Sequence, residues 1–140
     1  MTSRVISVGA EETVRTAARS LKQWNLGALP VCDSRGELRG VVTDRDIVLR
    51  CVALGEDAER TRVSEIMSRR VQTVEAGASV AEAAGIMARD RVRRLPVTDG
   101  GRLVGMLSLC DLAREESCAE ACAETVRSLS AAVHRAAPTM

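Results

Sequence analysis

The chain contains one sequence pattern twice, and this internal repeat constrains the possible fold more than any other feature. The segment GVVTDRDIVLR at residues 40–50 returns in altered form as GMLSLCDLARE at residues 105–115. Upstream of both, a shift of 66 residues aligns Leu29-Pro30-Val31 with Leu95-Pro96-Val97, and one residue is lost in the turn that follows. A register that holds over this length indicates two copies of one structural unit.

Both copies show the same succession of secondary-structure signals. A short β-branched run precedes a hydroxyl residue suited to cap a helix, and apolar residues spaced three and four apart then indicate one buried helical face. Gly27 is predicted to end the first helix. Two strand-like runs joined by a tight turn follow, and a second helix is expected to begin directly after Thr43 or Ser108. The order predicted for each copy is strand, helix, strand, strand, helix. The residues that carry these signals are Val5–Val8, Thr13, Val14, Ala17, Ala18, Leu21, Ala28–Cys32 and Leu38–Val42 in the first copy, and Val71–Val74, Ser79, Val80, Ala83, Ala84, Met87, Arg94–Thr98 and Leu103–Leu107 in the second.

Neither copy can cover both faces of so small a sheet by itself. We therefore predict an α/β fold in which two β-α-β-β-α repeats pack about a pseudo-twofold axis and share one core. Beyond the repeats, an Ala-rich stretch with Val126, Leu129 and Val133 predicts an additional C-terminal helix. The predicted parts are repeat 1 at residues 1–54, a linker at 55–62, repeat 2 at 63–114 and a C-terminal helical extension at 115–140.

Charge and composition argue against several classes of partner. The 20 basic and 19 acidic residues nearly cancel, so no whole-molecule field favours nucleic acid or an anionic membrane. With one Trp and no Tyr or Phe, almost nothing is available for nucleic-acid bases to stack on. No apolar run approaches the roughly 20 residues that span a bilayer, and the N-terminus has no signal-peptide pattern. We expect a cytoplasmic protein with neither a nucleic-acid nor a membrane partner.

Several motifs that occur twice in register together resemble a tandem pair of CBS domains, also called a Bateman module. The resemblance covers residues 1–114, and the run at residues 43–48 is similar to that of small stand-alone CBS-pair proteins, including hypoxic-response proteins. No catalytic or transporter domain accompanies the pair in this sequence, so the resemblance implies a regulatory module and not an enzyme. The motifs are Gly40-x-x-Thr43-x-x-Asp46, its copy Gly105-x-x-Ser108-x-x-Asp111, the Leu-Pro-Val of each repeat, and Ile66-Met67-Ser68.

The resemblance implies that an adenosine-type ligand, namely AMP, ADP, ATP or S-adenosylmethionine, binds in clefts between the repeats, with no cofactor required. It further implies a homodimer whose altered packing signals to an unknown protein partner. The repeated motif suits such a ligand, because its glycine allows close approach to the backbone and its aspartate can accept from both ribose hydroxyls. The Thr or Ser hydroxyl and the helix N-terminal amides would face the phosphate. The alternative is that Thr43 and Ser108 merely cap helices, with Asp46 and Asp111 complementing the helix dipole.

In the family each cleft takes residues from both repeats, and the two clefts of this chain are unequal. Arg93 and Arg94, which could neutralise a phosphate together with Arg45, have a solvated strand edge as their alternative role. The second cleft lacks the basic pair, and Leu109-Cys110 replaces Asp44-Arg45 there. The resemblance assigns Thr43, Arg45, Asp46, Val71, Thr73, Arg93 and Arg94 to the first cleft, and Ile6, Ala28, Leu29, Ser108 and Asp111 to the second, weaker one.

Other kinds of function have less support in the sequence. The single histidine, His134, has no Ser/His/Asp, Walker or HExxH context, so catalysis is not expected. The five cysteines are odd in number and include no CxxC pair, which argues against a disulfide framework or a zinc ribbon. Cys118 and Cys122 are four residues apart, on one face of the predicted C-terminal helix, and could form a thiol or zinc sensor or simply pack as small residues. A ligand-independent interaction module of the stress response is the remaining alternative.

Overall fold

The computed structural model describes residues 5–113 of the 140-residue chain. Its contacts divide the chain into two compact units. The repeat-1 unit consists of Ile6–Val71 with Gly101–Leu103, and the described residues of the repeat-2 unit are Val5, Gln72–Gly100 and 104–113. Apart from Gly101–Leu103, a turn segment of the second copy, each unit carries one copy of the repeat.

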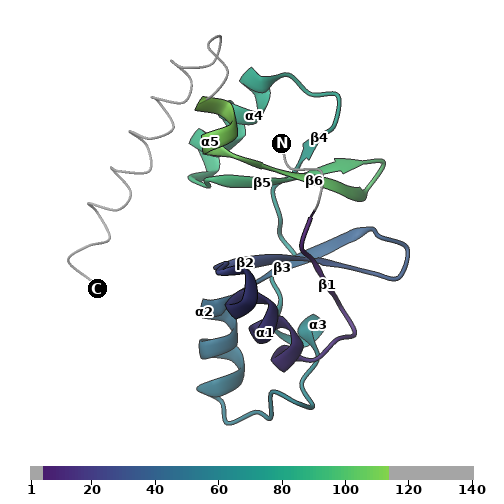
Figure 1. The fold of residues 1–140 in the computed structure, drawn as a ribbon, viewed down its shortest axis with the longest axis vertical. Coiled ribbons are helices and arrows are strands. Elements are labelled where there is room, and N and C mark those ends of the chain that lie inside the picture. Colours follow the sequence, from purple (N-terminus) through teal and green to yellow (C-terminus); the bar gives the residue numbers. More distant parts are fainter. Residues whose placement is uncertain (1–4, 114–140) are drawn as a thin grey trace, which may run out of the picture. The chain divides into compact units, whose positions relative to one another are not determined.

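The repeat-1 unit is a three-stranded sheet with helices on one face (Figure 1). The strand order is β1-β2-β3, with β1 parallel and β3 antiparallel to the central β2. Helices α1 and α2 lie on the same side of this sheet (Figure 1), and a π-helical turn, η1, continues α2. The elements are β1 (Val8–Gly9), α1 (Val14–Trp24), β2 (Ala28–Cys32), β3 (Leu38–Thr43), α2 (Asp44–Ile47), η1 (Val48–Val52) and α3 (Val63–Ile66).

Helix α1 begins at the predicted cap but ends before the predicted glycine. The Thr13 hydroxyl accepts a hydrogen bond from the Thr16 N–H at 3.2 Å, and the predicted apolar stripe is buried at Val14, Ala17 and Leu21. The helix ends at Asn25, which adopts a left-handed conformation with φ of 52°. The prediction that Gly27 ends this helix is therefore wrong. Asparagine tolerates the left-handed region better than most residues with a side chain, so no glycine was needed at this position.

The core of the repeat-1 unit extends beyond the repeat itself. Val63 and Ile66 of α3 and the following Met67 are buried in the same apolar cluster as residues of α1 and β2. The segment at 55–62, predicted to be a linker, hydrogen-bonds to the start of α1: the Val14 N–H donates to the Thr61 carbonyl at 2.9 Å and the Arg15 N–H to the Ala58 carbonyl at 3.0 Å. The predicted repeat boundaries rest on sequence register, which these contacts do not test, and they stay a prediction.

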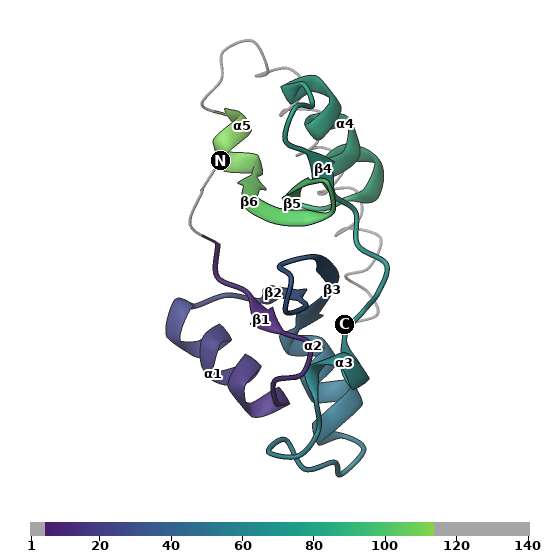
Figure 2. The same ribbon diagram turned by 90° about the vertical axis from the view of Figure 1, so that its right-hand side faces the viewer.

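The repeat-2 unit repeats this arrangement. Its sheet has the order β4-β5-β6, with β4 parallel to β5, and α4 and α5 cover one face of it (Figure 2). The Ser79 hydroxyl caps α4 by accepting from the Glu82 N–H at 3.1 Å. Buried residues of α4, including Met87, pack with Leu95 of β5 in a second apolar cluster. The elements are β4 (Val74–Glu75), α4 (Val80–Asp90), β5 (Arg94–Asp99), β6 (Arg102–Ser108) and α5 (Leu109–Ala113).

The predicted α/β class and the predicted element order are confirmed in both repeats. The first strand of each repeat is only two residues long, β1 and β4, and is shorter than the β-branched run from which it was predicted. The pseudo-twofold packing and the shared core stay predictions, and the C-terminal helix at 115–140 lies outside the described residues. In the described part of the chain, no helix has the length and apolar character that a membrane crossing requires.

Candidate functional site

Each repeat brings the start of one strand of its hairpin next to the start of the following helix. In the repeat-1 unit, Ala28 at the start of β2 pairs with Thr43 at the end of β3, and the Asp44 N–H donates to the Gly27 carbonyl at 3.1 Å. We call Gly27–Ala28 and Thr43–Asp46 corner 1. The register of the hairpin thus places the repeated Gly-x-x-Thr-x-x-Asp motif beside the residues that precede Leu-Pro-Val.

The repeat-2 unit forms the same corner with different side chains. The Leu109 N–H, at the start of α5, donates to the Arg93 carbonyl at 2.8 Å. We call Arg91–Arg94 and Ser108–Asp111 corner 2. Arg93 and Arg94 therefore neighbour Ser108 within their own repeat, whereas sequence analysis grouped them with Thr43 of the other repeat.

The repeated motif forms a reciprocal helix cap in both repeats. The Thr43 hydroxyl accepts from the Asp46 N–H at 3.0 Å, while the Thr43 N–H donates to Asp46 Oδ2 at 3.0 Å. Ser108 and Asp111 form the same pair, at 3.1 Å and 2.9 Å. This is a capping box with aspartate in the place of the usual glutamate. The capping role considered for these four residues is confirmed, and any ligand contact has to be compatible with it.

Asp46 uses only one of its carboxylate oxygens in the cap. The other oxygen, Oδ1, accepts no hydrogen bond from a described residue and lies 3.9 Å from Arg50 Nε. Arg50 is itself held in place, because its Nη1 donates to the Ile66 carbonyl at 3.0 Å. Sequence reasoning missed Arg50, although its position four residues after Asp46 is the spacing at which helical side chains meet.

The glycine of the first motif copy is required by the protein's own backbone. A Cβ atom at Gly40 would lie 2.5 Å from the Ser68 carbonyl oxygen. The neighbouring Val41 exchanges two backbone hydrogen bonds with Ser68, both 2.9 Å long. Close approach to Gly40 was predicted, but the approaching group is the chain after α3. The glycine therefore fixes the edge of β3 and is not by itself evidence of a ligand.

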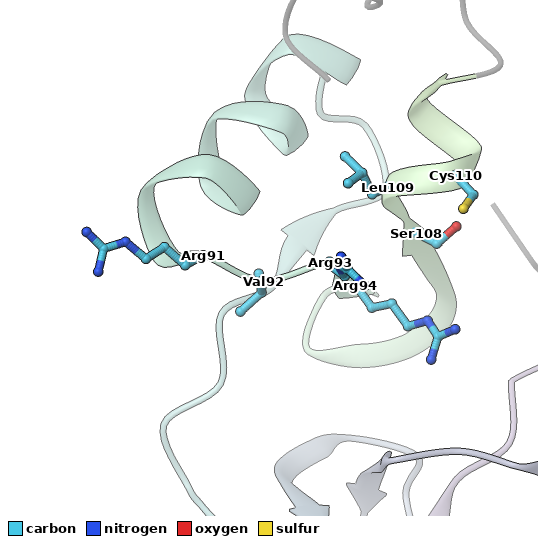
Figure 3. A pocket seen from close by; sticks show the side chains of 7 residues that line it. All are labelled: Arg91, Val92, Arg93, Arg94, Ser108, Leu109 and Cys110. Atoms are coloured by element: carbon cyan, nitrogen blue, oxygen red, sulfur yellow. The ribbon is translucent and has the colours of Figure 1, made fainter. Parts of the chain in front are cut away.

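Corner 2 lines a pocket with a volume of about 880 Å³. Arg94 extends toward the side on which Ser108 and Cys110 lie, and the Arg91 side chain extends away from them (Figure 3). A small-molecule site typically has a volume of about 300–1,000 Å³, and this pocket falls in that range. Its lining residues are Arg91, Val92, Arg93, Arg94, Ser108, Leu109 and Cys110.

The two corners differ in charge. In corner 2, the exposed Arg93 and Arg94 form no ion pair with any carboxylate of the described residues. The same register positions in corner 1 are the uncharged Gly27 and Ala28. Corner 1 instead carries Asp44 and Arg45 on α2, both exposed.

The remaining predicted site residues occupy different environments. Leu29 is completely buried in the repeat-1 core, so a ligand can reach only its main chain. Ile6 is partly buried against the same core, and Ala28 is exposed. Val71 belongs to the same compact unit as Thr43 and Asp46, whereas Thr73, Arg93 and Arg94 belong to the other. The grouping of residues from both repeats into clefts stays a prediction.

The described cysteines are in two kinds of environment. Cys32 and Cys51 are buried, and burial raises the pKa of the Cys32 thiol above its ordinary value. Cys110 is exposed at the pocket. Cys118 and Cys122, the candidate metal ligands, lie outside the described residues. Within residues 5–113, no three His, Cys, Asp or Glu side chains are grouped so that they could hold a metal ion.

Comparison with known proteins gives consistent matches over most of the chain. The CBS domain family matches residues 1–52 and 63–117. The CBS domain-containing protein YhcV of Bacillus subtilis is 39% identical over 130 residues, which cover 93% of this chain and 91% of that protein. Hypoxic response protein 1 of Mycobacterium tuberculosis is 38% identical over 114 residues, covering 81% of this chain and 80% of that protein. A crystal structure of Hypoxic Response Protein I with two coordinated zinc ions is similar with a TM-score of 0.74 at 37% identity, covering 82% of this chain and 93% of that one.

Proposed function

Because this chain belongs to the CBS domain family, as the sequence resemblance predicted, we propose that it binds an adenosine-type ligand and regulates an unknown protein partner. CBS-domain proteins of this kind are generally regulatory modules, and we assign no catalytic activity to this one. The ligand is AMP, ADP, ATP or S-adenosylmethionine, bound between the repeats in the cytoplasm. Ligand binding shifts the packing of a homodimer, which is the signal that the partner reads.

The observation that carries this proposal is the carboxylate of Asp46. Its Oδ2 is engaged in the helix cap, whereas Oδ1 accepts no hydrogen bond from a described residue and keeps only a 3.9 Å contact with Arg50. The cap fixes the carboxylate at the end of β3, so that Oδ1 is held ready to accept from a ribose hydroxyl. A charge-assisted hydrogen bond of this kind contributes about 1.5–3 kcal/mol.

The proposed first cleft combines this carboxylate with residues of the other unit. Thr43, Arg45 and Val71 accompany Asp46 from the repeat-1 unit, and Thr73, Arg93 and Arg94 come from the repeat-2 unit. The proposed second cleft pairs Ser108 and Asp111 with Ile6, Ala28 and the main chain of Leu29.

The proposed homodimer is supported by an apolar patch on η1 and the turn that follows it. Val48, Leu49, Val52 and Leu54 are large apolar residues with exposed fractions of 54%, 48%, 65% and 68%. Contiguous exposed apolar side chains of this size indicate an interaction surface. A second copy of the chain is the occupant that we propose, because pairing of two such patches buries both of them.

Thermal denaturation and calorimetry with AMP, ADP, ATP, adenosine and S-adenosylmethionine test the ligand proposal. A ligand present at about 100 times its dissociation constant adds roughly 2.7 kcal/mol to the free energy of unfolding, which raises the midpoint measurably. If no adenosine-type ligand raises it, the proposal is wrong and a ligand-independent interaction module is favoured.

Zinc binding is the second candidate function, because the similar Hypoxic Response Protein I structure holds two coordinated zinc ions. Its candidate ligands in this chain are Cys118 and Cys122. Metal analysis of the purified protein and of a Cys118→Ala/Cys122→Ala double variant tests it. If the cysteines only pack as small residues, zinc content and response to peroxide stay unchanged in the double variant. Stoichiometric zinc that disappears in the double variant favours the zinc-sensor function instead.

A further inference from the structure

The core of repeat 1 is covered by the stretch of chain that follows its second helix. The Val14 and Arg15 N–H groups, at the start of α1, donate to carbonyls of this stretch at 2.9 Å and 3.0 Å. In the other direction, the Val63 N–H at the start of α3 donates to the Glu12 carbonyl at 2.8 Å. Backbone hydrogen bonds therefore fasten residues 58–66 across the start of α1, and the apolar side chains of α3 are buried in the same core.

The described part of repeat 2 has no counterpart of this cover. The N–H groups of Val80 and Ala81, at the start of α4, donate to no described residue. Val80 is half-buried, whereas its counterpart Val14 is completely buried. In the same way, Leu107 is half-buried and its counterpart Val42 is completely buried. Two apolar side chains that pack on the repeat-2 core are thus less covered than their counterparts in repeat 1.

The last described residue lies within reach of the start of α4. Ala113 ends α5, whose Leu112 is buried with residues of α4 in the repeat-2 core, and the chain continues from 114 to 140. The stretch from Ala113 to Val126 spans roughly 20 Å as a helix and up to about 45 Å when extended. Since α4 itself is only about 16 Å long, this stretch can pass along the whole helix.

The segment beyond α5 carries an apolar stripe. Val126, Leu129 and Val133 are spaced three and four residues apart, which places their side chains on one face of the predicted C-terminal helix. Ser128 and Ala131 belong to its other face. A helix of this kind owes most of its stability to burial of its apolar face, so the stripe requires a surface to pack on.

The stripe begins at nearly the same distance along the chain as α3 does in repeat 1. Val63 of α3 comes 20 positions after Thr43, which caps α2. Val126 comes 18 positions after Ser108, which caps α5. In both cases another large apolar residue follows three positions later. The two stretches thus leave equivalent helices and present an apolar pair after a similar length of chain.

We propose that residues 126–133 of the same chain dock on the repeat-2 unit at the start of α4 and cover Val80, as residues 58–66 cover the start of α1 in repeat 1. The inference goes beyond the proposed ligand-binding function, because neither Val80 nor the segment is assigned to a ligand cleft. A protein partner that binds this surface has to displace the segment first, so the docked segment restricts access to repeat 2.

The first experiment follows hydrogen exchange of the full chain by mass spectrometry, in peptides that contain the start of α4. The first amides of a helix have no acceptor within it and exchange quickly unless another segment covers them. We expect slow exchange in the parent protein. Val126→Glu/Leu129→Glu should speed it by roughly tenfold or more, because charges in the stripe undock the segment. Ser128→Glu/Ala131→Glu adds the same charge to the other face and is the matched control, which should keep the parent's exchange.

The second experiment tests the contact from the side of α4. Val80→Glu places a carboxylate in the first turn of a helix, where an exposed carboxylate is favourable. It should nevertheless lower the unfolding midpoint of the full chain, because the docked segment covers this position. Ala81→Glu, at an exposed position, is the control and should not lower it. In the Val126→Glu/Leu129→Glu background the segment is already undocked, so Val80→Glu should lower the midpoint much less.

Several outcomes contradict docking within one chain. Parent-like exchange and midpoint in Val126→Glu/Leu129→Glu would show that the stripe does not dock. An equal effect of Ser128→Glu/Ala131→Glu would assign the change to added charge alone, and additive effects of the two substitutions in the second experiment would exclude a contact with Val80. Light scattering over a range of protein concentrations identifies the occupant: protection that is lost when a dimer dissociates assigns the surface to the segment of a second copy and overturns the proposal.

Discussion

Leu29 in β2 and Leu95 in β5 occupy the same register position in the two repeats, and both are completely buried. The two residues before them differ in size and charge: they are Gly27-Ala28 in repeat 1 and Arg93-Arg94 in repeat 2. One register position therefore keeps its residue type in both copies, while the adjacent positions change from uncharged to cationic.

The physical reason for this contrast is burial. A buried leucine fills a defined volume between a helix and a sheet, and replacing it leaves a cavity in either repeat. Side chains at the corner face solvent, so their charge can change without disturbing the core. The two repeats therefore share the packing of their cores and differ in the charge of the side chains exposed at the corner.

The largest effect is expected where the two repeats are alike. Leu29→Ala and Leu95→Ala should each lower the free energy of unfolding by about 2–5 kcal/mol, because each removes a fully buried side chain from its own core. Urea denaturation of both variants measures this. A cost at Leu95 far below that at Leu29 would contradict the view that the two cores are packed equivalently.

The next effect concerns a surface of repeat 1. Large exposed apolar side chains gather on η1 and just after it. Leu49→Glu/Val52→Glu should convert the proposed homodimer into a monomer of 15.0 kDa, because it places charges in the apolar patch. Light scattering reads the mass directly. Val104→Glu, which changes an exposed valine of β6 outside the patch, serves as control and should leave the dimer intact.

A smaller effect concerns the two aspartates of the repeated motif. Asp46→Ala should weaken binding of every adenosine-type ligand by roughly tenfold or more, because the ribose contact is common to all of them. Asp111→Ala should weaken it less, since our assignment places the ribose on Asp46. Calorimetry with adenosine measures both without any contribution from phosphate. A larger loss with Asp111→Ala would assign the ribose to the same corner as the arginines and overturn this part of the site.

The smallest effect is expected on the pH dependence of stability, through Asp33 in the β2–β3 turn. Partial desolvation raises the pKa of Asp33, but hydrogen bonds from the Glu37 and Arg35 N–H groups and the contact with Arg39 outweigh it, so the pKa lies below its ordinary value. Because the pKa is lower in the folded state, the ionised carboxylate stabilises the fold at pH values above the ordinary pKa of an aspartate. This stabilisation is lost as the pH falls below about 4.

Asp33→Asn should therefore flatten the loss of stability in acid that the parent shows, measured as the unfolding midpoint at a series of pH values. Asp99→Asn is the matched control in the β5–β6 turn, where Gly100 and Gly101 adopt positive φ angles of 60° and 87°. This control leaves the contacts of Asp33 intact and should retain the parent's pH dependence. An acid profile of Asp33→Asn identical to that of the parent would show that the Asp33 carboxylate does not contribute.

The sequence by itself determined the repeat, the order of strands and helices, and the caps at Thr13 and Ser79. These features depend on interactions between residues close in the chain, and the spacing of apolar residues reports them directly. The duplicated motif also identified Thr43, Asp46, Ser108 and Asp111 as a linked set. Its capping role was one of two alternatives that the sequence left open.

Tertiary structure decided which groups meet these residues. Only the fold shows that the backbone of Ser68 fills the space above Gly40, that Arg50 lies near the second oxygen of Asp46, and that Leu29 is turned into the core. It also placed Arg93 beside Ser108, since the Leu109 N–H donates to the Arg93 carbonyl, although sequence reasoning had assigned Arg93 and Ser108 to different clefts. Contacts between distant segments depend on strand register and on the direction of each side chain, and a pattern of residue types along the chain specifies neither.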